Sequence, residues 1–248
     1  MKAALIPPKG YEYTALSSNI HLGLPLWETR TNPDYIDYLR AAHERGDYII
    51  MDNGCAEGKL VDSKTLMEFA HSVLADEVVA PDVMGFMQPT LTTTMQFVEE
   101  IRGEQINVMG VLQGQSIHEI EELLSHYVIT PTITAVGIPK VHVKHSFDHS
   151  RANIARLIME RYPGRFEIHL LGNSKFFPSE LYDIPFPEGI RSMDSALPYK
   201  ATEAGTPLVP SMPHPKRRGD YFLTCRPVDT IRLKANILVF RDWAEKHG

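Results

Sequence analysis

The sequence is poor in cysteine and has no long apolar run. Its two cysteines, Cys55 and Cys225, cannot build a disulfide framework, and they do not have the spacing of metal ligands. No apolar stretch is long enough to cross a bilayer. The opening segment "MKAALIPPKGYEY" has too short an apolar part for a signal peptide. We therefore expect a protein of the reducing cytoplasm with no membrane partner and no bound metal.

The chain also lacks a glycine-rich dinucleotide-binding motif, a P-loop, an internal repeat and an interdomain linker. With 248 residues it is long enough for one large α/β domain or two small ones. We expect no cofactor, and one domain over residues 1–248.

Acidic residues outnumber basic ones, 31 to 25, and the net charge is −6. This balance argues against nonspecific binding to nucleic acid, but it leaves room for a local basic patch. The segment "HPKRRG" (214–219) places Lys216, Arg217 and Arg218 in a proline-flanked loop. Two interpretations stay open, a phosphate-binding loop beside an active site or a solvated run of surface charge.

Short apolar segments alternate with amphipathic ones along most of the chain. The short segments predict buried strands at 48–52, 77–83, 107–114, 133–139 and 166–173, with two more in "AALIP" near the start and "IRSMD" near residue 190. The amphipathic segments predict helices at 63–75, 89–103, 116–128 and 148–164, with Ser116 and Asp148 as N-caps, and a final helix in "TIRLKANILVFRDWAEKH". Strands that alternate with helices imply a parallel sheet covered by helices.

About seven or eight strand–helix units can be counted. Eight such units close a (β/α)8 TIM barrel, for which ~250 residues is a typical size. We therefore predict a trimmed TIM barrel with an added C-terminal helix. An open doubly wound sheet is the alternative, although no glycine-rich signature favours it.

Polar residues recur where the predicted strands end. In a TIM barrel these ends form the catalytic face. Two carboxylates in one pocket can take different protonation states, one acting as nucleophile and one as proton carrier. A further carboxylate with an amide suits the hydrogen-bonding edge of a nucleobase. Each aspartate alone is also what a helix N-cap or a turn uses, and that interpretation stays open. The strand-end residues are Asp52, Asp82, Gln113, Gly137, Gly172, Asn173 and Asp194.

The ordered series "MDNGCAEG", "PDV", "VLQG", "AVGIP", "HLLGNS" and "MDSALPYK" resembles the tRNA-guanine transglycosylases. The resemblance spans roughly residues 48 to 205, and "MDSALPYK" carries it most specifically. It implies a TIM barrel that replaces guanine in a polynucleotide by a 7-deazaguanine base.

The resemblance also implies a role for each matching residue. Asp194 would be the nucleophile that attacks C1′ and holds the sugar covalently, and Asp52 the general acid and base. Asp82 and Gln113 would bind the base edge. The remaining implied contacts are the backbone of Gly137 and Ile138, the pocket-lining Leu171 and Gly172, and Lys200 near a phosphate.

The chain departs from the family in two respects. It lacks the Cys-x-Cys-x-x-Cys…His zinc site, so no zinc subdomain is expected, and Ala56 stands where the family has a stacking Phe. Met84 or Phe86 are candidates for the missing stacking face. These departures favour the reduced relatives associated with DNA modification in bacteria and phages, and therefore DNA over tRNA as the polynucleotide. The other expected partners are guanine and a free 7-deazaguanine, 7-cyano-7-deazaguanine or a related base, while a homodimer or a helper protein stays open.

Two rival functions remain on the sequence alone. One is a TIM-barrel hydrolase or lyase that uses the aspartate pair on a small molecule. The other is a nucleobase-binding module that has lost its chemistry.

Overall fold

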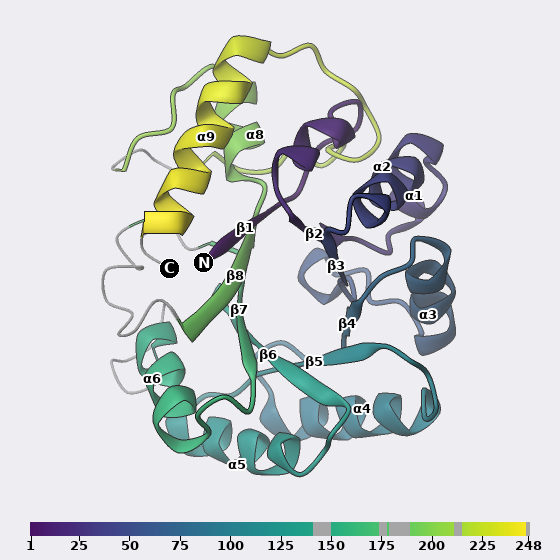
Figure 1. Cartoon of the computed structure of the whole chain (residues 1–248), viewed down its shortest axis with the longest axis vertical. Helices are drawn as coiled ribbons and strands as arrows, with labels where there is room; N and C mark the ends of the chain where they lie inside the picture. The colour runs from purple at the N-terminus through teal and green to yellow at the C-terminus, as the bar shows by residue number, and fades with distance from the viewer. Residues whose placement is uncertain (141–149, 174–177, 179–188, 211–214, 247–248) are drawn as a thin grey trace.

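The structure is a computed structural model that describes residues 1–140, 150–173, 178, 189–210 and 215–246. Eight parallel strands form a closed barrel in which strand order follows chain order and β8 pairs with β1 (Figure 1). The predicted TIM barrel is therefore confirmed, and the open sheet is excluded. The strands are β1 (Lys2–Leu5), β2 (Ile20–Gly23), β3 (Tyr48–Met51), β4 (Glu77–Val79), β5 (Asn107–Val111), β6 (Ile133–Pro139), β7 (Glu167–Leu171) and β8 (Ile190–Ser195).

Helices surround the barrel, and the last helix packs against α8 and β1 beside the N-terminus (Figure 1). The described helices are α1 (Trp27–Arg30), α2 (Pro33–Glu44), α3 (Ser63–Ser72), α4 (Met87–Glu100), α5 (Ile117–Val128), α6 (Arg151–Arg161), α8 (Leu197–Glu203) and α9 (Thr230–Lys246), with 3₁₀ turns η1 (Glu12–Ser17) and η2 (Cys55–Glu57). In the described part of the chain, no helix combines the length and the apolar character that crossing a membrane requires.

Side-chain caps set where several helices begin. Ser116 caps α5 as predicted, because its Oγ accepts a hydrogen bond from the Glu119 N–H at 3.2 Å. Helix α6 is capped by Ser150, which accepts from the Asn153 N–H at 3.2 Å, and it begins at Arg151. The predicted start at residue 148 was therefore too early, and Asp148 itself lies outside the described residues.

The strand β2 was missed by the sequence analysis. It is only four residues long and contains a histidine, so its apolar signal is weak. All four residues are nevertheless buried. His21 is accommodated because its ring nitrogens lie 3.0 Å from the Tyr38 hydroxyl and 3.0 Å from Asp47 Oδ2. Tyr38 of α2 and Asp47, just before β3, thus supply the polar partners that make this strand possible.

A buried ion pair closes the N-terminal end of the barrel. Arg191 of β8 donates two hydrogen bonds of 2.8 Å to the two carboxylate oxygens of Glu77 on β4. The Tyr48 hydroxyl donates a third bond to Glu77 at 3.1 Å. Because β4 and β8 lie on opposite sides of the barrel, this contact crosses its interior. It forms a rigid polar floor below the end of the barrel that carries the candidate site.

Candidate active site

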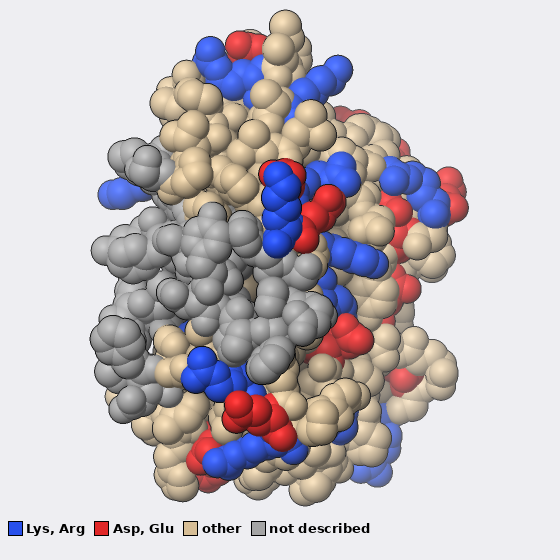
Figure 2. All heavy atoms as spheres, turned by 60° about the vertical axis from the view of Figure 1, so that its left-hand side comes forward, with Lys and Arg blue, Asp and Glu red and all other residues tan. Residues whose placement is uncertain are grey.

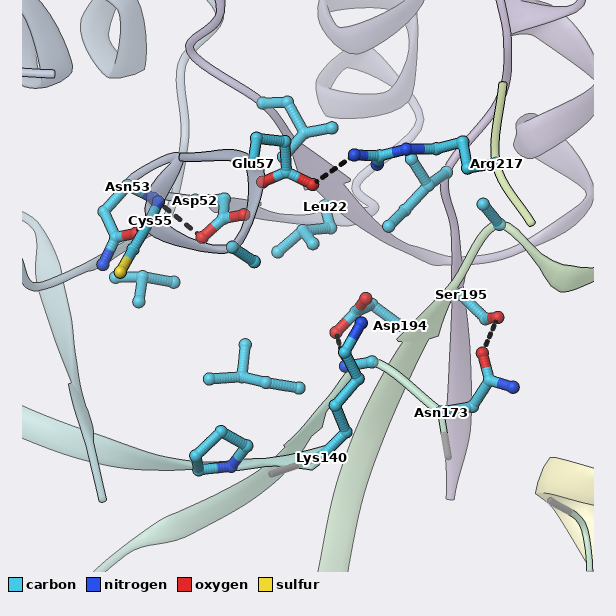
Figure 3. A pocket seen from close by; sticks show the side chains of 18 of the residues that line it. Leu22, Asp52, Asn53, Cys55, Glu57, Lys140, Asn173, Asp194, Ser195 and Arg217 are labelled. Atoms are coloured by element: carbon cyan, nitrogen blue, oxygen red, sulfur yellow. Dashed lines mark hydrogen bonds and ion pairs between the residues drawn. The ribbon is translucent and has the colours of Figure 1, made fainter. Parts of the chain in front are cut away.

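A cavity of about 680 Å³ opens at the carboxyl ends of the strands. It is lined by residues from several strand ends together with the loop before α9 (Figure 3). The structure therefore brings together most of the residues that the sequence analysis singled out. Those that line the cavity are Asp52, Asp82, Gln113, Leu171, Gly172, Asn173, Asp194, Lys200, Lys216 and Arg217.

Asp194 lies near the end of β8, and its carboxylate points into the cavity (Figure 3). Its Oδ1 accepts a hydrogen bond of 2.7 Å from the Gly172 N–H and lies 3.1 Å from His169 Nε2. Its Oδ2 has no hydrogen-bond partner among the described residues. The side chain is therefore fixed through one oxygen while the other is left for an incoming group.

His169 lies on β7 and is fully buried, and its imidazole contacts Asp194 from the interior of the barrel. Its Nδ1 lies 2.8 Å from Ser192 Oγ. Burial lowers the pKa of His169, so the imidazole is neutral near pH 7. A neutral ring has one donor, and the consistent assignment is that Nε2–H donates to Asp194 while the Ser192 hydroxyl donates to Nδ1. Asp194 therefore accepts two hydrogen bonds, which hold its carboxyl group in place.

Asp52 follows β3 across the cavity from Asp194 (Figure 3). Its Oδ1 accepts a hydrogen bond from the Asn53 N–H at 2.8 Å. Burial, and then the negative charges of Glu57 and Asp194, raise the pKa of Asp52 well above its usual range. The two carboxyl groups are thus placed in different settings. Asp194 is held by two donors, and Asp52 holds a proton to a higher pH than an ordinary aspartate does.

Asp82 and Gln113 form a hydrogen-bonded pair in the wall of the cavity. Asp82 Oδ2 accepts from Gln113 Nε2 at 2.6 Å, and its Oδ1 accepts from Asn53 Nδ2 at 2.7 Å. Gln113 Oε1 accepts from the Gly85 N–H at 2.9 Å. Burial raises the pKa of Asp82, and the bonds from Asn53 and Gln113 oppose that rise. The pair presents fixed polar groups to a ligand that enters the cavity.

Gly137 and Ile138 do not line the cavity, although the sequence analysis placed their backbone in it. The Gly137 carbonyl accepts from the Leu112 N–H at 2.9 Å, and the Ile138 carbonyl accepts from Arg151 at 3.0 Å. A Cβ on Gly137 would lie 2.6 Å from Leu171 Cδ1, so this glycine gives the Leu171 side chain its space. The cavity begins later in β6, at Pro139.

The basic residues of the loop before α9 have different surroundings. Lys216 and Arg217 line the cavity, and Arg217 pairs with Glu57 at 2.9 Å. Arg218 does not line it. It pairs instead with Glu203 and Asp220, each at 2.9 Å, and donates to the Thr224 carbonyl. The assignment of Arg218 to a phosphate contact is therefore not supported by its position, because its guanidinium is already engaged in holding the loop.

Charge on the outer surface is mixed. On the face shown in Figure 2, acidic and basic side chains are interspersed among the described residues without an extended area of one sign.

Sequence reasoning missed three residues of this site, namely Glu57, Lys140 and His169. Glu57 and Lys140 line the cavity, and His169 contacts Asp194 from below. His169 had a visible signal, since a histidine within an apolar strand needs a buried polar partner. Nothing in the local sequence distinguishes Glu57 or Lys140 from surface residues.

Cys55 is held as a protonated thiol. Its Sγ donates to the Asp82 carbonyl at 3.4 Å, and burial together with the charge of Asp82 raises its pKa to about 12. The thiol is therefore poorly suited to act as a nucleophile. Within the described ranges, no cluster of histidine, cysteine and acidic side chains is arranged to hold a metal ion.

Comparison with known proteins adds no assignment to this geometry. No protein-family model matches the chain, and no curated protein matches it.

Proposed function

We propose that this protein is a base-exchange glycosyltransferase that replaces guanine in a polynucleotide by a 7-deazaguanine base. The observation that carries the proposal is the unequal pair of carboxyl groups across the cavity. Asp194 accepts hydrogen bonds from Gly172 and His169, whereas the pKa of Asp52 is raised. A nucleophile and a proton carrier are the two groups that such an exchange requires.

In the first half of the reaction, Asp194 displaces guanine. Its free Oδ2 forms a bond to C1′ of the target nucleotide while the bond between C1′ and N9 breaks. The electron pair of the broken bond leaves with the base, and the proton on Asp52 neutralises it. The sugar remains bound to Asp194 as a covalent intermediate.

In the second half, the incoming base takes the place of guanine. Asp52, now a carboxylate, accepts the proton from N9 of the 7-deazaguanine. N9 then bonds to C1′, and the bond between C1′ and Asp194 breaks, returning its electron pair to the carboxylate. Both aspartates end in their starting forms, so the exchange needs no cofactor.

Asp82 and Gln113 fit the recognition of the base. A carboxylate accepts hydrogen bonds from the ring N–H and the exocyclic amine of a guanine-like edge, and an amide can donate to its carbonyl. Their mutual hydrogen bond of 2.6 Å holds both groups before a ligand arrives. Met84 lines the cavity and is the candidate for the apolar face against the ring, whereas Phe86 does not line it.

The polynucleotide is proposed to be DNA rather than tRNA. Lys200, Lys216 and Arg217 at the cavity supply positive charge for a phosphate backbone. The chain has two cysteines and therefore lacks the cysteine-rich zinc motif associated with tRNA binding in the enzymes that it resembles.

A base-exchange assay tests the proposal. Labelled guanine or 7-cyano-7-deazaguanine is incubated with the protein and with either duplex DNA or unmodified tRNA. Asp194→Ala and Asp52→Asn are compared with Asp37→Asn, a control on the exposed face of α2. We expect label to enter DNA with the unaltered protein and the control, and with neither cavity variant.

The other outcomes separate the rival functions. Label that enters only tRNA would overturn the choice of polynucleotide and keep the chemistry. Base binding that survives Asp194→Ala without any exchange by the unaltered protein would indicate a nucleobase-binding module. Turnover of a small molecule without a polynucleotide would indicate a hydrolase or lyase.

A further inference from the structure

Four basic side chains line the cavity, Lys216 and three others from separate parts of the chain. Lys140 follows β6, Lys200 lies in α8 and Arg217 lies in the loop before α9. Arg217 is paired with Glu57, but neither Lys140 nor Lys200 has a carboxylate partner among the residues that the structure describes. Positive groups without counter-ions at the wall of one cavity indicate a place for an anion.

The Lys140 side chain lies close against the backbone of Gly172. Its Cδ and Nζ lie 3.2 and 3.8 Å from the point where a Cβ on Gly172 would stand. Gly172 has a φ of 65°, in the left-handed region that favours glycine. The same residue donates its N–H to Asp194. The Lys140 side chain therefore lies over the residue that holds the proposed nucleophile, and Figure 3 shows it extending into the cavity alongside Asp194.

This arrangement of positive charges disfavours the protonated form of Lys200. It is half-buried, and burial together with the charges of Lys140 and Arg217 lowers its pKa to about 8. A lysine so placed gains its proton more readily when an anion binds beside it. The positive charges of both lysines would therefore stabilise a negative group that binds close to them.

We propose that Lys140 and Lys200 together bind the phosphodiester group that adjoins the sugar attacked by Asp194. This inference rests on the proposed function and adds to it a second phosphate-binding residue, Lys140, close to the nucleophile. A phosphate bound there would lie in the same cavity as the carboxylate that is proposed to attack C1′. The lysine pair acts on the backbone and not on the base, so it carries no base specificity.

The binding of a short dye-labelled guanine-containing DNA tests the subsite. Dissociation constants are measured by fluorescence anisotropy over a salt series for Lys140→Met, Lys200→Met and the control Lys64→Met, an exposed lysine of α3. Methionine keeps the aliphatic chain and removes the charge. We expect each cavity variant to bind about tenfold more weakly, and the slope of log affinity against log salt to flatten by about 0.9. The control should change neither quantity.

A second measurement tests whether the substitution of Lys140 has collapsed the cavity. Free guanine should bind Lys140→Met and the unaltered protein equally, because the lysine contacts only phosphate. Unchanged affinity and salt slope in Lys140→Met would overturn the inference, and so would a parallel loss of guanine binding.

A competition experiment and the base-exchange assay complete the test. The first identifies the source of the phosphate, and the second distinguishes failure of this inference from failure of the proposed function. A nucleoside 5′-monophosphate that competes as well as the DNA would show a site for free phosphate esters, against the proposal. DNA binding that depends on Lys140 without any base exchange would support the subsite and reject the proposed function. Base exchange that is unaffected by Lys140→Met would reject the subsite alone.

Discussion

His169 Nε2 lies 3.1 Å from Asp194 Oδ1, and the two side chains are both buried. The imidazole is itself held by Ser192 at 2.8 Å, and Arg191 Nε lies 3.3 Å from the same serine hydroxyl. Arg191 in turn is bound to Glu77 on the opposite wall. A continuous chain of polar contacts therefore links the floor of the barrel to the proposed nucleophile. His169 acts through Asp194 and is a positioning residue.

Replacing His169 by phenylalanine should lower kcat of base exchange by about ten- to a hundredfold, since a hydrogen bond to a charged group contributes about 1.5–3 kcal/mol. KM for the polynucleotide should stay nearly constant, because His169 is buried beneath the cavity and does not line it. Steady-state kinetics measures both quantities.

His169→Gln is the matched control for this prediction, because its amide can still donate to Asp194. A glutamine variant as impaired as the phenylalanine variant would point to a packing defect and contradict a positioning role.

Glu57→Gln should alter the pH dependence through Asp52. The charge of Glu57 is one of the causes that raise the pKa of Asp52, so its removal should lower that pKa. In the proposed reaction Asp52 must be protonated to release guanine, so activity should be lost as pH rises through its pKa. The alkaline limb of the first-half rate should therefore move to lower pH in Glu57→Gln.

Single-turnover release of guanine over a pH series measures this shift. Glu203→Gln provides the comparison, because Glu203 pairs with Arg218, which does not line the cavity. An alkaline limb that stays in place in Glu57→Gln, or that moves equally in Glu203→Gln, would rule out the electrostatic coupling.

Breaking the ion pair of the barrel floor should destabilise the fold. Arg191→Met leaves the fully buried Glu77 without its main partner, and such losses cost about 3–5 kcal/mol. Arg102→Met, which breaks an exposed pair with Glu99, should cost less than about 1 kcal/mol. Urea unfolding monitored by circular dichroism compares the two. Equal midpoints for the two variants would show that the floor does not stabilise the barrel.

Substitutions of the two neighbouring arginines in the loop before α9 should have different effects. Arg217→Ala removes a cation from the cavity wall and should flatten the salt dependence of DNA binding by about 0.9. Arg218→Ala should leave that slope unchanged and lower the free energy of unfolding by about 1–2 kcal/mol, because its ion pairs hold the loop. Anisotropy titrations and urea unfolding on both variants give the comparison. A flattened slope in Arg218→Ala would indicate that Arg218 does contact the nucleic acid.

Several features of the fold could be predicted from the sequence because they depend on neighbouring residues. The predicted strands at 133–139 and 166–173 contain β6 and β7, since their apolar runs have a length typical of buried strands. Cap positions within a turn of the helix start were also accessible, as at Ser116. Where the local signal was weak, prediction failed. β2 was missed, and α8 was not among the predicted helices, although proline at Pro198 fits the first turn of a helix.

The sequence by itself determined the alternation of strands and helices and put Asp52, Asp82, Gln113 and Asp194 at strand ends, because burial leaves a periodic pattern and polar residues end it. Only the tertiary structure decided that β8 closes on β1, which needs contacts across almost the whole chain. It also decided that Arg217 lines the cavity while Arg218 does not, that His169 contacts Asp194, and that Lys140 lies over Gly172. These outcomes depend on side-chain direction and on partners distant in sequence, and a local pattern carries neither.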